Sequence, residues 1–254
     1  MGMKSLRLML ASAPALVLFR DSPQDNARHG TILFYHGFGA SKETSVPMLS
    51  RLATAGFLAV GIDGIGHGER RYVDFDARFP SVASHLMGNA QLEAAFLEVV
   101  RATVREVPGI LDALLHQHWA SPKQIGISGL SFGGFVSYAA VVADKRIRAA
   151  APVVGSPQWK LPWPDSPHLH LDRFYPTALL SQTTGLDTNQ PPGAVRAFHQ
   201  QLAPYYVQAP ERLRYIEYPN SPHELRRQDE EEAWNAVVNW FEIFLSSPKA
   251  RACS

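Results

Sequence analysis

The stretch Gln124-Ile125-Gly126-Ile127-Ser128-Gly129-Leu130-Ser131-Phe132-Gly133-Gly134 decides the fold of this chain. Its first half is a short apolar run typical of a buried strand, and residues 135–144 beyond it have the pattern of a helix. Ser131 lies between the two, with glycine two positions before it and two positions after it. A serine on so sharp a turn needs such neighbours, because side chains there would stop the backbone from bending enough to expose Oγ. The stretch therefore predicts a nucleophile elbow at Ser131, and a flexible Gly-Ser turn is the alternative.

A serine of this kind needs an acid and then a histidine later in the chain. Asp187 fits the acid, because it follows the apolar run 177–184 and a turn that contains glycine. His223 fits the base, because it ends the turn 219–223 after a strand-like alternation. The nearest competitors are Asp172 for the acid and His199 for the base, in segments that resemble an insertion and a helix.

An earlier loop can complete such a site. The β-branched and aromatic run 31–35 leads into His36-Gly37-Phe38-Gly39-Ala40-Ser41. Acyl transfer places negative charge on a carbonyl oxygen, which two N–H donors in a water-poor pocket can stabilise. One donor commonly belongs to the residue after the nucleophile and the other to a loop of this kind. We therefore expect the backbone N–H groups of Phe38 and Phe132 to form an oxyanion hole; taken alone, the loop is also compatible with a glycine-rich surface turn.

With these elements the sequence resembles the α/β-hydrolase superfamily, in particular the compact branch of dienelactone hydrolases and the catalytic domains of prolyl-oligopeptidase-like enzymes. The resemblance extends from about Gly30 to Leu245 and includes the loop 63–68, Asp-Gly-Ile-Gly-His-Gly. It implies Ser131 as nucleophile, Asp187 as acid, His223 as base, and Phe38 with Phe132 as oxyanion donors. His67 in that loop precedes Ser131, so we expect it to be structural. Dienelactone hydrolases carry a cysteine nucleophile, and the serine of this chain favours ordinary esters.

Strands and helices alternate along the 254 residues, which predicts one α/β-hydrolase domain over residues 1–254. We expect a mostly parallel central sheet, an N-terminal antiparallel hairpin, and helices on both faces. The longest helical signal extends over residues 89–116, and Pro108 is expected to kink or divide that helix.

The segment 156–176 is rich in proline and aromatic residues, and we interpret it as a small lid over the carboxyl ends of the strands. Its candidate substrate-binding residues are Trp159, Trp163, Phe174 and Tyr175. Surface packing is the alternative interpretation.

Composition excludes several classes of protein. The net charge is +1, with dispersed Lys and Arg residues, so neither nucleic acid nor a membrane surface is an expected partner. Lys4 and Arg7 precede an apolar run as in a signal peptide, but its leucines alternate as in a strand, so we expect a hairpin and a cytoplasmic protein. The one cysteine, Cys253, permits no intrachain disulfide.

We expect no cofactor and no metal. The pairs His116/His118 and His168/His170 have no cysteine or carboxylate at a metal-site spacing, and the glycines of residues 61–68 do not form a dinucleotide-binding motif. A triad with an oxyanion hole also supplies nucleophile, proton transfer and charge stabilisation by itself.

The sequence thus predicts a serine hydrolase that cleaves small to medium carboxylic esters through an acyl-enzyme. An amide or peptide hydrolase, a thioesterase or acyltransferase, and a non-catalytic binding protein on the same fold remain alternatives. The oligomeric state is left open.

Overall fold

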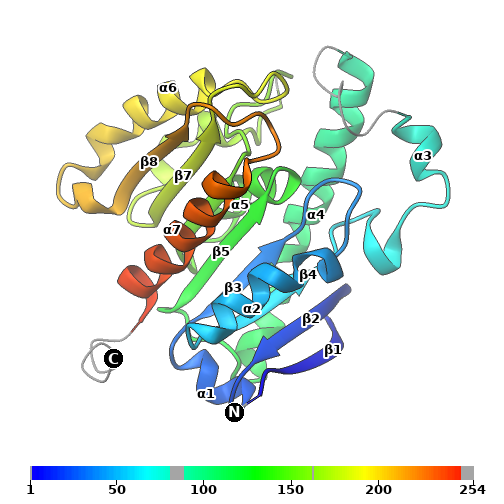
Figure 1. The fold of residues 1–254 in the computed structure, drawn as a ribbon, viewed down its shortest axis with the longest axis vertical. Coiled ribbons are helices and arrows are strands. Elements are labelled where there is room, and N and C mark those ends of the chain that lie inside the picture. The colour runs from blue at the N-terminus through cyan, green and yellow to red at the C-terminus, as the bar shows by residue number, and fades with distance from the viewer. Residues whose placement is uncertain (1, 81–88, 162, 247–254) are drawn as a thin grey trace.

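The computed structural model describes residues 2–80, 89–161 and 163–246 (Figure 1). Within these residues eight strands form one sheet in the order β1-β2-β4-β3-β5-β6-β7-β8. The hairpin strands β1 and β2 are antiparallel, β2 is antiparallel to β4, and all other neighbours are parallel. The strands are β1 Lys4–Leu10, β2 Ala13–Phe19, β3 Thr31–Tyr35, β4 Leu58–Ile62, β5 Ile125–Leu130, β6 Ile147–Val153, β7 Ala178–Thr184 and β8 Leu213–Tyr218.

Helices cover both faces of this sheet. They are α1 Pro23–Ala27, α2 Val46–Thr54, α3 Phe75–Arg78, α4 Ala90–His116, α5 Phe132–Ala143, α6 Gly193–Leu202 and α7 Arg227–Leu245, with short 3-10 turns between them. Apolar side chains of α2 and α7 pack on one face, which is the nearer one in Figure 1, and those of α4, α5 and α6 pack on the other. The predicted fold class and the N-terminal hairpin are confirmed.

The central strands explain the position of the candidate nucleophile. All five residues of β3 and the first five of β5 are buried, as expected for parallel strands covered on both faces. Since β3 to β8 are parallel, their carboxyl ends meet at one edge of the sheet. The loops that follow β3, β4, β5, β7 and β8 therefore converge there, and they carry the predicted catalytic residues and oxyanion donors.

Helix α4 corrects one expectation. Asn89 caps its first turn, because its side chain accepts hydrogen bonds from the backbone N–H groups of Gln91 and Leu92. The helix then continues through Pro108 to His116 without a break, so of the two expected outcomes, a kink or a division, the division does not occur. Val104, Val107 and other apolar residues on both sides of the proline are buried in the core, and this packing outweighs the hydrogen bond that proline removes.

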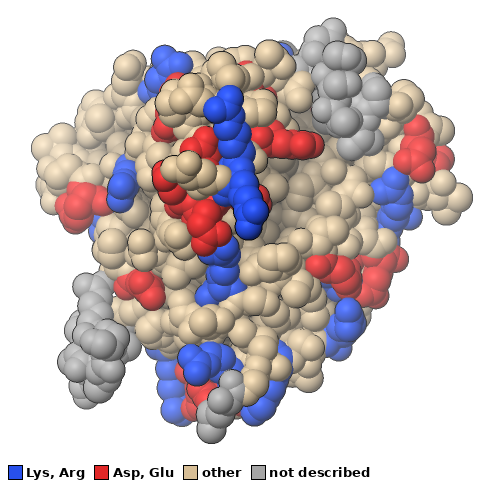
Figure 2. All heavy atoms as spheres, in the orientation of Figure 1, with Lys and Arg blue, Asp and Glu red and all other residues tan. Residues whose placement is uncertain are grey.

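The described surface carries both signs of charge. On the face seen in Figure 2, basic and acidic side chains lie beside one another. Arg51 and Glu231 form one ion pair of the described residues, at 2.5 Å. No helix in the described part of the chain is long and apolar enough to cross a membrane. Cys253 lies outside the described residues.

Candidate active site

Ser131 lies at the junction of β5 and α5 in a strained conformation, with φ 53° and ψ −105°. Its two glycine neighbours allow this turn. A side chain on Gly129 would place Cβ 2.5 Å from the carbonyl oxygen of Tyr35, and one on Gly133 would lie closer still to the same oxygen. The backbone N–H of Ser131 donates to the Val153 carbonyl at 2.8 Å, which fixes the turn against β6. The sequence around Ser131 therefore dictates a tight turn that presents Oγ at the sheet edge.

Three predicted side chains meet at this edge. Ser131 Oγ lies 3.0 Å from His223 Nε2, and His223 Nδ1 lies 2.7 Å from Asp187 Oδ2. Asp187 follows β7 and His223 follows β8, so the sheet topology brings together residues 36 and 92 positions apart in the chain. The histidine side chain keeps 29% of its surface exposed, while the carboxylate of Asp187 is fully buried.

The surroundings of Asp187 favour its ionised form. Burial alone would raise its pKa, but the hydrogen bond with His223 and the backbone N–H groups of Asn189 and Gln190 lower the pKa below its ordinary value. Both N–H groups donate to Oδ1 at 2.8 Å. Because Oδ1 is held in this way, Oδ2 stays directed at the imidazole. A carboxylate there selects the tautomer with a proton on Nδ1 and leaves Nε2 free to accept one.

Backbone hydrogen bonds join the two loops that carry this pair. Gly185 N–H donates to the Tyr218 carbonyl at 2.8 Å, and Leu186 N–H donates to the Ser221 carbonyl at 3.0 Å. The buried Ser221 hydroxyl in turn donates to Asp229 at 2.6 Å and accepts the Arg226 N–H at 2.9 Å. The loop of the candidate base is thus anchored to both its neighbour and α7.

The competing residues lie elsewhere. Asp172 is exposed in a 3-10 turn, and His199 is buried on α6 with Nε2 2.7 Å from the Ser181 hydroxyl. Within the described residues, neither contacts Ser131 or His223.

Phe38 and Phe132, the candidate oxyanion donors, are neighbours at the same edge. Phe132 is the first residue of α5, so its backbone N–H has no acceptor within the helix. The two phenyl rings lie 6.0 Å apart, and the His67 ring contacts each of them at 4.9 Å. The carbonyl of His36 also accepts the Gly133 N–H at 3.1 Å, which ties the loop after β3 to the elbow.

His67 has the structural role expected of it. Its ring is fully buried, and Nδ1 donates to the Ile65 carbonyl at 2.8 Å. Burial lowers its pKa to about 4, so the imidazole is neutral at pH 7. The neutral ring packs between Phe38 and Phe132 without adding positive charge.

A buried ion cluster supports this side of the site, and sequence reasoning missed it. Lys42 and Asp63 are both fully buried, with Nζ 2.7 Å from Oδ2, and Lys42 also reaches Glu69 at 2.5 Å. Asp63 accepts the backbone N–H of Lys42 at 2.8 Å and that of Glu69 at 3.0 Å. Burial opposes both charges, yet these contacts raise the pKa of Lys42 and lower that of Asp63. The sequence contained a signal for this ion pair. Lys42 directly follows the loop 36–41, and Asp63 directly follows β4, so both residues lie at the carboxyl edge of the sheet.

The four aromatic residues proposed to bind substrate lie apart from the Ser131–His223 pair. Phe174 is buried against Phe198 of α6 at 5.0 Å, and Tyr175 packs on Tyr206 at 5.4 Å. Thr177, just beyond them, donates its hydroxyl to the Ile147 carbonyl at the start of β6. This is the amino edge of the parallel sheet, opposite Ser131. The placement of Phe174 and Tyr175 thus differs from the expected one, because the chain crosses the length of the sheet before β7 begins.

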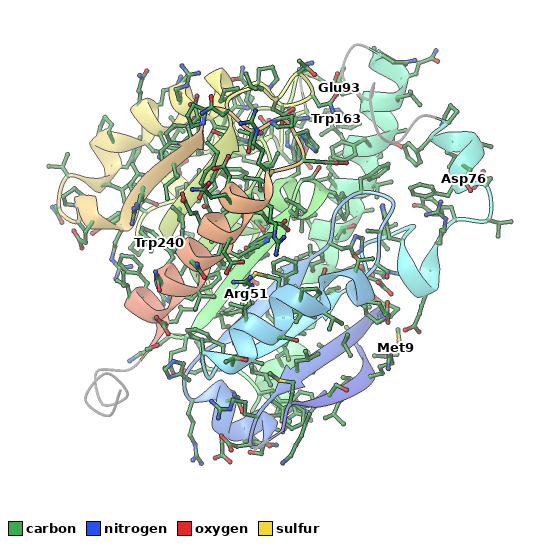
Figure 3. The ribbon with its side chains drawn as sticks, in the orientation of Figure 1. Met9, Arg51, Asp76, Glu93, Trp163 and Trp240 are labelled. Atoms are coloured by element: carbon green, nitrogen blue, oxygen red, sulfur yellow. The ribbon has the colours of Figure 1, made fainter. Side chains whose placement is uncertain are left out.

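The two tryptophans contact α4 and α5. Trp159 is buried in the core on that face, and Trp163 lies under the guanidinium of Arg101 at 4.1 Å. Figure 3 labels Trp163 and Glu93, which lie in the same part of that view. The backbone of Lys160 hydrogen-bonds Glu93 at the start of α4. The described part of the segment 156–176 therefore follows these helices; Pro162 lies outside the described residues.

The side chains of Ser131, His223 and Asp187 are capable of nucleophilic and acid–base chemistry. Among the described residues, no cluster of three or more His, Cys, Asp or Glu side chains has an arrangement that could hold a metal ion. His168 lies beside the Ser166 hydroxyl, and His170 beside the Pro164 carbonyl.

Comparisons with known proteins agree with this architecture. Residues 32–249 match the model of a family described as "Alpha/beta hydrolase family". A Bacillus subtilis (strain 168) protein named "Putative esterase YitV" is 24% identical in an alignment 243 residues long that covers 84% of this chain and 89% of that protein. The structure of TT1662 from Thermus thermophilus superposes with a TM-score of 0.76 at 19% identity and covers 97% of this chain and 100% of that one. A protein from Klebsiella pneumoniae subsp. pneumoniae MGH 78578, named "Putative Dienelactone Hydrolase", superposes with a TM-score of 0.70 at 15% identity, over 94% and 98% of the two chains.

Proposed function

The chain belongs to the alpha/beta hydrolase family, and from that premise we propose that it is a serine esterase that hydrolyses small to medium carboxylic esters. The observation that carries this proposal is the chain of contacts from Ser131 Oγ through His223 to Asp187, at 3.0 and 2.7 Å. These distances suit transfer of the serine proton to Nε2 while the carboxylate holds Nδ1–H. The esterase name of the Bacillus subtilis relative adds support.

In the proposed reaction, His223 Nε2 takes the proton of Ser131 as Oγ attacks the ester carbonyl. The backbone N–H groups of Phe38 and Phe132 donate to the oxygen that becomes negative. Asp187 stabilises the imidazolium, which then gives its proton to the departing alcohol. Water, deprotonated by the same histidine, attacks the acyl-serine and releases the acid and free Ser131.

The packing around Phe38 favours a small acyl group on that side of the site. The rings of Phe79, Phe96 and Phe75 lie 4.8, 5.1 and 5.4 Å from it. All three are buried, so they fill the space beside the proposed oxyanion hole with side chains. In a pocket of limited length, each methylene of the acyl chain that fits adds at most about 0.8 kcal/mol of binding free energy. Methylenes beyond the end of the pocket add none.

Labelling with a fluorophosphonate tests the nucleophile. We expect stoichiometric labelling of the wild type that is lost in Ser131→Ala, with the thermal unfolding midpoint preserved. Ser137→Ala is the matched control, since Ser137 lies on the same helix and its hydroxyl donates to the Gly133 carbonyl. Labelling that persists in Ser131→Ala would reject the proposed nucleophile, and an unlabelled wild type would favour a non-catalytic binding protein.

Turnover then separates the hydrolase classes. p-Nitrophenyl esters from acetyl to dodecanoyl are compared with a thioester and an anilide of the same acyl group. We expect kcat/KM to be highest for a short or medium ester and to fall at longer chains. A preference for the anilide would indicate an amidase, and a preference for the thioester would indicate a thioesterase.

A further inference from the structure

A cavity of about 570 Å³ lies away from the candidate active site, between α4, α5 and the segment 156–176. Its α5 wall consists of Ala139, Val142 and Ala143. At 1.5 Å per residue these lie about 12 to 18 Å along the helix from Ser131. None of Ser131, Asp187 and His223 lines the cavity. It is large enough for a small organic molecule, since such sites commonly measure about 300 to 1,000 Å³.

The floor of this cavity is apolar. Val104 of α4, Ala139 and Val142 of α5, and Trp159 line it, and each is largely buried. Apolar side chains that surround an open space of this size favour a hydrocarbon group as the occupant.

The rim is positively charged. Arg101, Arg105 and Arg173 line the cavity with one acidic residue, Asp165. Arg101 is compensated, because its Nε lies 2.6 Å from Asp165. Arg173 donates to the Val142 carbonyl at 3.2 Å, and Arg105 is exposed with no ion-pair partner among the described residues. Two guanidinium groups at the mouth therefore have no carboxylate to balance them.

The lining matches one class of ligand. A guanidinium pair and an apolar floor together match a carboxylate with a hydrocarbon body, since guanidinium groups bind carboxylates in a planar, paired geometry. Trp159 is one of the lining residues, and its Nε1 has no partner among the described residues, so its indole group can report on an occupant.

We propose that this cavity is a second ligand site, which binds a small organic carboxylate. The carboxylate contacts Arg105 and Arg173, and the hydrocarbon part lies on Val104, Val142 and Trp159. The nearby Asp165 disfavours a more highly charged anion such as a phosphate. This inference does not depend on the proposed esterase activity.

The indole resonance of Trp159 in a ¹H–¹⁵N correlation spectrum provides a local readout, and Trp159→Phe assigns it. We expect titration with hexanoate to shift this resonance saturably, and hexanol, the neutral match, to shift it far less. Arg105→Gln should weaken hexanoate binding about tenfold, as expected for loss of one charged contact. Arg214→Gln, which removes an exposed arginine of β8, should leave binding unchanged.

A second variant tests the apolar part. Ala143→Leu adds bulk at the exposed rim and should abolish the saturable shift while the spectrum remains that of a folded protein. The proposal is overturned if the indole resonance of Trp159 shows no saturable shift up to roughly 50 mM hexanoate. A dissociation constant above that concentration would be too weak for a specific site. Equal shifts with hexanol, or unchanged affinity in Arg105→Gln, would overturn it as well. Ester hydrolysis by Arg105→Gln should equal that of the wild type, so the two proposals fail separately.

Discussion

The two halves of the candidate site are built in different ways. Asp187 and His223 lie on loops held by hydrogen bonds, and the histidine is partly open to solvent. The half that carries Phe38 and Phe132 rests on the buried Lys42–Asp63 pair and on the neutral ring of His67. In the proposed reaction the first half must gain and lose a proton in every turnover, whereas the second only has to present fixed N–H dipoles. In the proposed reaction, solvent contact is thus kept at His223, where the charge changes, and is removed at the residues whose charge stays constant, the buried Asp187 included.

The largest expected effect concerns the half of the site that contains Asp187 and His223. Asp187→Asn should lower kcat about 10⁴-fold with little change in KM, because the amide favours the wrong imidazole tautomer. The unfolding midpoint should stay near that of the wild type. Steady-state kinetics with a p-nitrophenyl ester measure the effect, and Asp172→Asn, at the exposed competing acid, should retain full activity. A loss below tenfold in Asp187→Asn would show that this half does not work as proposed.

Removing charge from the other half should primarily cost stability. Lys42→Met leaves Asp63 buried without its cation, and loss of one partner of a buried pair costs about 3 to 5 kcal/mol in the free energy of unfolding. Urea titration measures this loss. The double variant Lys42→Met/Asp63→Asn should recover part of it, and Lys123→Met, at an exposed lysine, should change stability little. If Lys42→Met is as stable as the wild type, the half that carries Phe38 and Phe132 does not depend on the buried ion pair.

The buried histidines should make the fold sensitive to acid. His67 and His199 have folded pKa values of about 4, below the ordinary 6.5, owing to burial. The unfolded chain therefore takes up these protons first, so the stability they contribute is complete above about pH 6.5 and is lost as the pH falls toward 4. Each contributes up to about 1.4 kcal/mol per pH unit within that window.

His67→Phe tests this dependence, since a phenyl ring can keep the contacts with Phe38 and Phe132. The free energy of unfolding is measured by urea titration at several pH values between 7 and 4.5. Its dependence on pH should be less steep than in the wild type, by the equivalent of about one proton. The exposed His116→Gln is the control and should keep the wild-type slope. An unchanged slope in His67→Phe would mean that this ring does not account for the acid sensitivity.

The smallest expected effect concerns the support of the histidine loop. Ser221→Ala removes the hydrogen bonds to Asp229 and from Arg226, so His223 is held less firmly. We expect kcat to fall about tenfold, equivalent to the ~1.4 kcal/mol of a hydrogen bond, with KM nearly unchanged. The exposed Ser5→Ala should have no effect. If kcat is unaffected in Ser221→Ala, the loop does not depend on this anchor.

The sequence predicted the sheet and the meeting of Ser131, Asp187 and His223, because an elbow and two strand-end turns fix where parallel strands deliver these residues. The family membership inferred from the same motifs is confirmed. The sequence did not predict the placement of Phe174 and Tyr175. The aromatic content of a segment indicates that it packs against the core, but not at which end of the sheet it does so. The sequence also did not predict the burial of Lys42. A lysine normally lies at the protein surface, and the burial of this one depends on Asp63, which is 21 positions away.

The backbone hydrogen bonds between the loops after β7 and β8 have a consequence for motion. Gly185 and Leu186 are bound to Tyr218 and Ser221, so a displacement of either loop carries the other with it. We therefore expect any displacement of these loops to preserve the separation of His223 and Asp187 and to change the distance from His223 to Ser131, on the turn between β5 and α5. The proposed acid and base would then move as one body relative to the proposed nucleophile.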